Sequence, residues 1–173
     1  MKILIMNGPN LNLLGEREPG IYGRGTMDDC MEGLRRAFPE VELVYYQSNV
    51  EGFLIDRLQQ ARSEGVAGVV LNAGAYTHTS VALHDCIRSL QMPVVEVHIS
   101  NVHRREEFRH RSMISAACAG VICGFGLDSY RLAVSALVQA GGERACAGWR
   151  RGAMTNNSSF GFSKGGLKAQ CST

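Results

Sequence analysis

Short apolar runs alternate along the chain with segments in which apolar residues recur every three or four positions. Each run has the length of a strand that is buried on both faces of a sheet, because apolar side chains occupy successive positions. The intervening segments carry a single apolar stripe at the period of an α-helix. The pattern predicts strands at residues 3–6, 41–46, 68–71, 94–99 and 120–123.

The apolar stripes between these runs predict amphipathic helices. Thr26 and Asp29, at the start of the first stripe, resemble a capping box, and Asp128 is well placed to cap the last helix. Strands that alternate with helices indicate an α/β protein with a parallel, doubly wound sheet, because parallel neighbours need right-handed crossovers. Ligands of such sheets bind at the carboxyl ends of the strands. The stripes comprise Met27, Cys30, Met31, Leu34 and Phe38; Leu54, Leu58 and Ala61; Leu83, Ile87 and Leu90; and Tyr130, Val134, Leu137 and Val138.

Length and composition suit one globular domain. The chain has 173 residues, of which 45% are hydrophobic and 20% are charged, and this composition is too apolar for general disorder. The alternating pattern stops near Gly142, and Gly, Ser, Asn and Ala dominate the rest of the sequence. We therefore expect a folded domain at residues 1–142 that carries the function, followed by a disordered tail at residues 143–173.

Charge, cysteine usage and the N-terminal run narrow the class of protein. The formal net charge is only +2, which disfavours a nucleic-acid partner. The six cysteines are scattered, without Cys-x-x-Cys pairs, so we expect buried or incidental thiols rather than a metal site. The N-terminal apolar run is interpreted as a buried strand and not as a signal peptide, which predicts a cytoplasmic protein with no membrane partner.

A Gly-rich stretch at residues 15–25 separates the first strand from the next helix and contains Arg17 and Tyr22. The stretch is long for this position, and long loops in compact domains are commonly lids or binding loops. An Arg and a Tyr flanked by glycines favour a closing lid that contributes chemistry. The alternative is an ordinary surface loop.

Polar side chains also stand where the third and fourth strands end. Asn72 and His78 precede a helix N-terminus, where backbone amides can receive an anion or a hydroxyl-rich ligand; a histidine at a helix start is also a common structural feature. Glu96 and His98 share one face of the fourth strand, because side chains alternate along a strand. Ionisable groups in an apolar run are costly unless they are paired or used, which favours a functional role for this pair.

The segment at residues 104–111 mixes positive and negative charges at helical spacing. Such a pattern is typical of a solvated face with salt bridges. Because the segment follows His98 closely, Arg105 or Arg109 can also reach an acidic substrate.

Four segments, at residues 7–14, 17–23, 72–83 and 96–108, together resemble the type II 3-dehydroquinate dehydratases in their order and spacing. The resemblance covers about residues 1–140. It implies a flavodoxin-like three-layer sandwich with a five-stranded parallel sheet, and an enzyme that dehydrates 3-dehydroquinate to 3-dehydroshikimate in the shikimate pathway. It also implies that neither a metal nor an organic cofactor is used, and that the chain forms a homo-oligomer, a dodecamer of trimers.

The same resemblance implies roles for individual residues. Tyr22 matches the base that removes a C2 proton, and Arg17 matches the group that favours its phenolate and stabilises the transition state. His98 matches the general acid for the C1 hydroxyl, and Asn10 the residue that holds a water against the enolate oxygen. The remaining matches are substrate-binding positions at Asn72, His78, Ile99, Ser100 and Arg109, a supporting carboxylate at Glu96, and Asp85, which reaches the site of a neighbouring subunit.

The lysines argue against the alternative route to the same product, which passes through a Schiff base. The only lysines are Lys2, at the start of the first predicted strand, and Lys164 and Lys168 in the predicted tail. None of them is expected at the carboxyl ends of the sheet.

Two other interpretations of the topology remain open, because a fold by itself does not assign a function. A flavin- or nucleotide-binding module is favoured by Gly-Phe-Gly at residues 124–126, although Ser129 stands where the dinucleotide fingerprint has its third glycine. A phospho-receiver domain needs acidic residues after the first and third strands, where this chain has Asn7, Asn10 and Asn72.

Overall fold

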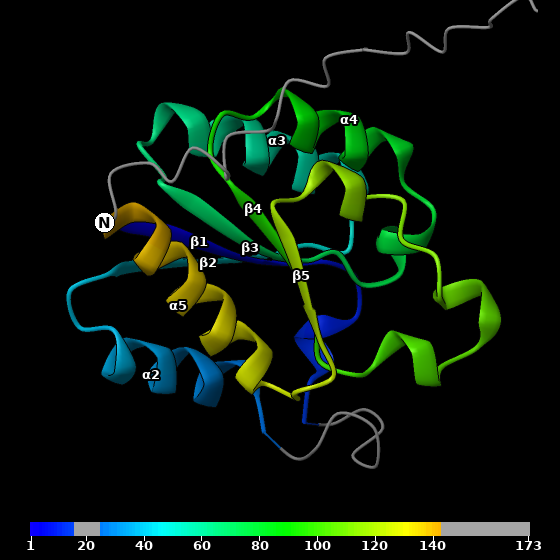
Figure 1. Ribbon diagram of the computed structural model, residues 1–173, viewed down its shortest axis with the longest axis horizontal. Coiled ribbons are helices and arrows are strands. Elements are labelled where there is room, and N and C mark those ends of the chain that lie inside the picture. Colours follow the sequence, from blue (N-terminus) through cyan, green and yellow to red (C-terminus); the bar gives the residue numbers. More distant parts are fainter. Residues whose placement is uncertain (16–24, 143–173) are drawn as a thin grey trace, which may run out of the picture.

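A single parallel sheet organises the chain, and the computed structural model describes residues 1–15 and 25–142 around it. Its five strands lie in the order β2-β1-β3-β4-β5, with every neighbouring pair parallel (Figure 1). This order confirms the predicted flavodoxin-like sheet. The predicted tail at residues 143–173 lies outside the described residues. The strands are β1 (Lys2–Asn7), β2 (Glu42–Gln47), β3 (Gly68–Asn72), β4 (Val94–His98) and β5 (Gly120–Cys123).

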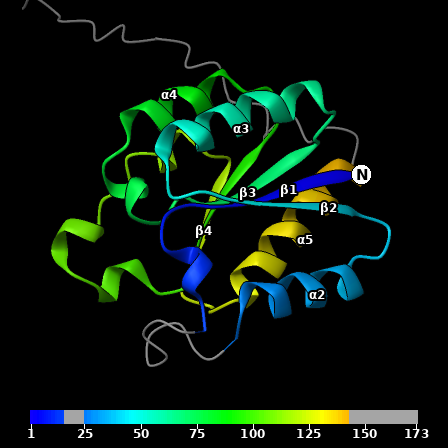
Figure 2. The same cartoon turned by 180° about the vertical axis from the view of Figure 1, so that it is seen from behind.

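Helices cover both faces of the sheet and complete a three-layer sandwich (Figures 1 and 2). The helices α3 and α4 lie on one face, and α2 and α5 lie on the other. Each pair buries its apolar stripe against the sheet, so the molecule has one hydrophobic core on either side. Their bounds are α2 (Met27–Ala37), α3 (Glu51–Ser63), α4 (Val81–Ser89) and α5 (Asp128–Gly142).

Side-chain caps mark the start of two of the four described helices, α2 and α4. The hydroxyl oxygen of Thr26 accepts from the amide of Asp29, and the carboxylate of Asp29 accepts from the amide of Thr26, which confirms the predicted capping box. Ser80 caps α4 in the same way through the amide of Leu83. The prediction for Asp128 differs: this residue is the first of α5, and both of its carboxylate oxygens accept hydrogen bonds from Arg131. A salt bridge within the first turn thus occupies the carboxylate that was expected to act as a cap.

Of the three inner strands, β3 and β4 are buried at every position, because helices cover them on both faces. Their carboxyl ends lead into short 3-10 turns rather than directly into long helices. The charged segment at residues 104–111 begins at the end of one such turn, Val102–Arg104, and contains another, Glu107–Arg109. This segment has no apolar stripe that could pack against the core. Because tertiary packing supplies most of the stability of a protein helix, the segment forms short turns and not one long helix.

Candidate active site

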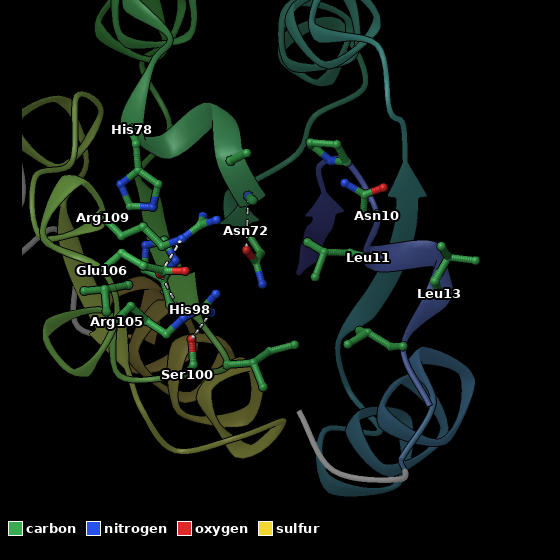
Figure 3. Close-up of a pocket in the computed structure, with 16 residues that line it drawn as sticks. Asn10, Leu11, Leu13, Asn72, His78, His98, Ser100, Arg105, Glu106 and Arg109 are labelled. Carbon is green, nitrogen blue, oxygen red and sulfur yellow. Dashed lines mark hydrogen bonds and ion pairs between the residues drawn. The ribbon is translucent and has the colours of Figure 1, made fainter. Parts of the chain in front are cut away.

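A cavity of about 330 Å³ opens at the carboxyl edge of the sheet, beside the ends of β1, β3 and β4. It lies where the chain order of the strands reverses between β1 and β3, which is the usual ligand position in open α/β sheets. Figure 3 shows the labelled residues after β1 on one side of the cavity and the β4 residues with the charged segment on the other. The cavity is lined by Pro9, Asn10, Leu11, Leu13, Leu14, Asn72, Gly74, Ala75, His78, His98, Ile99, Ser100, Val102, Arg105, Glu106 and Arg109.

The first wall begins where β1 meets the end of β3. The backbone amide of Gly8 donates to the carbonyl of Asn72 at 2.7 Å. A Cβ at Gly8 would overlap the carbonyl of Ala73, so only glycine permits this approach. Asn10 follows in the left-handed conformation with φ of 65°, which asparagine tolerates better than most residues. Its amide donates to the side-chain Oδ1 of Asn49 at 2.9 Å, which anchors the backbone beside the cavity.

On the opposite wall, His98 and Glu96 form a buried pair on β4. Nε2 of His98 lies 2.7 Å from Oε1 of Glu96, and Glu96 is only 1% exposed. The other carboxylate oxygen accepts from the hydroxyls of Ser115 at 2.6 Å and Ser112 at 3.2 Å. Because the oxygen of Ser112 also accepts two backbone amides, its own hydrogen is left for Glu96. The serines thus hold one oxygen of Glu96 while the other engages Nε2 of His98, which orients the ring and leaves its Nδ1 for a ligand.

His78 brings a second imidazole to the cavity. Its Nδ1 lies 2.8 Å from the carbonyl of Arg111. A carbonyl can only accept, so Nδ1 carries the hydrogen and Nε2 is free to accept when the ring is neutral. The rings of His78 and His98 are stacked with centroids 6.3 Å apart. Two imidazoles therefore lie side by side on one wall of the cavity.

Two arginines add positive charge beside these histidines. The carboxylate of Glu106 accepts from Nε of Arg109 at 3.0 Å and forms an ion pair with Nε of Arg105 at 3.4 Å. A hydrogen bond from its own backbone amide, together with these arginines, lowers the pKa of Glu106. Arg105 also donates to the hydroxyl of Ser100 at 3.4 Å. Among the described lining residues, two arginines accompany one carboxylate, so this wall of the cavity suits an anionic ligand.

The turn between β5 and α5 supports the segment that follows β4. The amide of Gly126 donates to the carbonyl of Ile99 at 2.9 Å, and the hydroxyl of Ser129 donates to the carbonyl of His98 at 3.0 Å. Gly126 has φ of 61°, a conformation that favours glycine. The Gly-Phe-Gly turn thus fixes Ile99 and Ser100 at the wall of the cavity, which gives these glycines a structural role in place of a nucleotide fingerprint.

The predicted site residues divide into three groups. Glu96 stands behind His98, outside the lining of the cavity, and Asp85 is exposed on α4 and does not line it. Arg17 and Tyr22 lie outside the described residues. The structure brings the other predicted residues together at the cavity: Asn10, Asn72, His78, His98, Ile99, Ser100 and Arg109.

The two serines that hold Glu96 were not predicted from the sequence as site residues, and neither was Glu106. Ser112 and Ser115 belong to no periodic pattern, and their pairing with Glu96 depends on how residues 111–118 return to the sheet. The Arg-Glu alternation at residues 104–109 was a signal for Glu106, because an acidic residue between arginines commonly pairs with them.

No three His, Cys, Asp or Glu side chains within residues 1–15 and 25–142 form a group that could hold a metal ion. Among the helices that the structure describes, none has the length and apolar character needed to cross a membrane.

Comparison with known proteins places the chain in a family. The chain is 57% identical over 140 residues to the 3-dehydroquinate dehydratase of Chlorobaculum tepidum, an alignment that covers 80% of this chain and 95% of that protein. It is 59% identical over 137 residues to the 3-dehydroquinate dehydratase of Rhizobium johnstonii, with 78% and 94% covered. The crystal structure of the type II dehydroquinase from Butyrivibrio crossotus superposes with a TM-score of 0.78 at 45% identity, over 80% of this chain and 97% of that one. The sequence model of the Dehydroquinase class II family matches residues 1–138, and the chain therefore belongs to the class II dehydroquinase family of enzymes.

Proposed function

We propose that this chain removes water from 3-dehydroquinate to give 3-dehydroshikimate, as a step of the shikimate pathway. Membership of the class II dehydroquinase family supports the reaction. The observation that carries the proposal is the buried Glu96–His98 pair at the wall of a cationic cavity. The substrate has a carboxylate and several hydroxyls, which match the arginines, imidazoles and amides around that cavity.

The proposed reaction is a trans elimination through an enolate. Tyr22, as phenolate, takes the proton from C2, and the electron pair of that C–H bond moves towards the C3 carbonyl, whose oxygen becomes negative. When the enolate collapses, the C1–oxygen bond breaks and His98 gives its proton to the departing hydroxyl, which leaves as water. The substrate therefore loses one proton to Tyr22 and one hydroxyl to solvent, and no electron acceptor is needed.

Arg17 and Asn10 complete this mechanism by stabilising negative charge. A free phenol titrates near pH ~10, so only about one molecule in a thousand is phenolate at neutral pH. A guanidinium beside the phenol favours the charged form, which is the role proposed for Arg17. Asn10 is proposed to hold a water against the enolate oxygen, where a fixed donor is most effective.

The contacts of His98 support its role as the general acid. Because Nε2 is engaged by Glu96 at 2.7 Å, the ring can present only Nδ1 to a ligand. A protonated ring then donates from both nitrogens, and the hydrogen on Nδ1 is the one transferred. The carboxylate of Glu96 keeps the ring oriented and stabilises its positive charge before the transfer. Binding of the substrate is proposed for Asn72, His78, Arg109 and the amides of Ile99 and Ser100.

We also propose that the chain assembles as a dodecamer of trimers, in which Asp85 reaches the cavity of a neighbouring subunit. Asp85 is exposed on α4 and outside its own cavity, as this role requires. Exposed apolar side chains on the same layer support an interface there, including Phe53 at 56% and Val81 at 55% exposure. Light scattering of the purified protein is expected to give twelve times the chain mass; a monomer would refute the assembly.

The activity is tested by following the absorbance of the new conjugated double bond when purified protein meets 3-dehydroquinate. Wild type is expected to be active, and Tyr22→Phe and His98→Ala to lose about 100- to 10,000-fold in kcat, the usual contribution of a general acid or base. Tyr46→Phe and His103→Ala are matched controls outside the cavity and are expected to keep their activity. Silence of wild type would overturn the proposed reaction, and full activity of either site variant would overturn the role of that residue.

A Schiff-base route is disfavoured by the position of Lys2, the one lysine among the described residues. Lys2 pairs with Glu42 at 3.0 Å at the amino end of β1, on the opposite edge of the sheet from the cavity. Borohydride traps imines, so treatment in the presence of substrate is expected to leave the activity unchanged. Inactivation with the mass of a substrate adduct would revive the covalent route.

A further inference from the structure

Tyr130 lies at the centre of a buried polar network behind the cavity. Its ring is fully buried on α5 among the apolar residues that cover one face of the sheet. Its hydroxyl reaches the last residues of two neighbouring strands, Asn7 of β1 and Asn72 of β3, which are partners in the sheet register. The distances are 2.8 Å to Oδ1 of Asn7 and 3.0 Å to Nδ2 of Asn72. Asn72 lines the cavity, and Tyr130 does not.

The direction of every hydrogen bond in this network follows from one backbone amide. The N–H of Gly74 can only donate, so the atom of Asn72 that faces it at 3.3 Å is the oxygen. The nitrogen of Asn72 therefore faces Tyr130 and donates to its hydroxyl. That hydroxyl has one hydrogen, which goes to the oxygen of Asn7. The nitrogen of Asn7 is then left for the sulfur of Met27 at 3.3 Å and a weak contact to Tyr45 at 3.5 Å.

This arrangement leaves one donor for a ligand. An asparagine side chain has two hydrogens on Nδ2, and Tyr130 accepts one of them from Asn72. Among the described residues the second hydrogen has no acceptor, and Asn72 forms part of the cavity wall. If the amide were reversed, its oxygen would face the cavity side and the site would present an acceptor where it now presents a donor.

Tyr130 is well suited to hold this orientation. Burial raises the pKa of its phenol above the ordinary value of 10.0, so the hydroxyl stays protonated and can both donate and accept. The bond from Gly74 to Asn72 is long at 3.3 Å and would hold the amide only weakly by itself. The shorter bond to Tyr130 is therefore the main restraint on the side chain of Asn72.

We propose that Tyr130 is a positioning residue that acts through Asn72: it holds the carboxamide so that Nδ2 donates to an oxygen of the bound substrate. This inference rests on the proposed function, since it takes the cavity to bind 3-dehydroquinate. A hydroxyl of the substrate matches the donor, because it has lone pairs to accept the hydrogen. Tyr130 itself does not touch the substrate.

The test is a double-mutant cycle between Tyr130→Phe and Asn72→Ala, with kcat and KM measured separately. Loss of one oriented hydrogen bond of about 0.5–1.5 kcal/mol corresponds to a rise in KM of about two- to twelvefold. Tyr130→Phe is expected to raise KM in this range and to have no further effect when Asn72 is already Ala. Tyr45→Phe is the matched control, because Tyr45 contacts Asn7 but not Asn72, and its KM is expected to stay at the wild-type value.

Each other outcome has a clear meaning. An unchanged KM for Tyr130→Phe would overturn the proposal, and so would an effect of equal size in the Asn72→Ala background. In either case, activity of the wild type would leave the proposed function standing. If Tyr130→Phe does not fold, Asn7→Ala provides the second variant, because it removes the acceptor of the Tyr130 hydroxyl and frees that hydrogen to compete for Asn72. It is expected to raise KM only when Asn72 is present; an unchanged KM would count against the proposal.

Discussion

The hydroxyl of Ser115 offers the sharpest test of how the site holds its general acid. Ser115 donates to Oε2 of Glu96 at 2.6 Å, the shortest of the three hydrogen bonds to a carboxylate that is 1% exposed. In Ser115→Ala this oxygen keeps only the longer bond from Ser112 at 3.2 Å. A hydrogen bond to a charged group contributes about 1.5–3 kcal/mol to stability. We expect the free energy of unfolding to fall by that amount.

Activity should fall together with stability, because Glu96 transmits the restraint to His98. If the same 1.5–3 kcal/mol is lost at the transition state, kcat decreases about 10- to 150-fold, since about 1.36 kcal/mol corresponds to a factor of ten. The substrate contacts proposed for Asn72 and Arg109 are unchanged, so KM should move much less than kcat. A change confined to KM would therefore contradict the role given to Glu96.

Stability is measured by urea unfolding at a fixed protein concentration, because association would otherwise shift the midpoint. The matched control is Ser63→Ala, whose hydroxyl donates to an uncharged backbone carbonyl on the exposed side of α3 at 2.8 Å. This control is expected to change stability by less than about 0.5 kcal/mol. If Ser115→Ala lowers the free energy of unfolding no more than Ser63→Ala does, then Glu96 is not the buried carboxylate that organises this wall of the cavity.

Three further predictions follow from burial and close contacts. Gly8→Ala should destabilise the protein by about 1–3 kcal/mol in urea unfolding, because the new Cβ overlaps the carbonyl of Ala73. The control Gly33→Ala lies on an open helix surface and should be neutral or stabilising. Equal effects of the two substitutions would refute the clash at Gly8. Burial raises the pKa of the Cys30 thiol to about 11. At pH 8 a chromogenic disulfide should therefore react with Cys30 about tenfold more slowly than with free cysteine. Equal reaction rates would contradict the raised pKa. Burial also raises the pKa of Tyr130 above 10.0, so its contribution to stability is complete below that pH and declines as the pH rises further; unfolding free energies that stay constant from pH 9 to 11.5 would refute it.

Periodicity predicted the fold well because the sheet is covered on both faces. A strand with helices on either side must be apolar at successive positions, and β3 and β4 are buried throughout. The strand boundaries differ from the predictions by at most one residue. The polar ends Asn7 and Asn72 extend their strands because they still pair in the register of the sheet, although an apolar pattern ends before them.

The candidate site was predicted less completely, because its parts meet only in three dimensions. The shared face of Glu96 and His98 follows from the alternation of one strand and was predicted, whereas the hydrogen bond between them is a finding of the structure. Tyr130 was predicted as part of an apolar stripe, and nothing in that stripe indicates a hydrogen bond to a residue 58 positions away. Ser115 is likewise 19 positions from its partner, and no local pattern connects them.

The position of Asn7 and Asn72 explains why polar residues are buried at the centre of this sheet. From β1 and β3 the chain turns away to opposite faces, to α2 and towards α4, so the crevice between these strand ends has no crossover to cover it. The polar side chains buried at these strand ends need partners, since an unpaired buried amide costs about 1–3 kcal/mol. Tyr130 supplies a partner from α5 and accepts and donates at once. Because Tyr130 provides hydrogen-bond partners for the side chains of Asn7 and Asn72, it also determines which group of Asn72 faces the cavity. Stability and recognition therefore depend on the same hydroxyl.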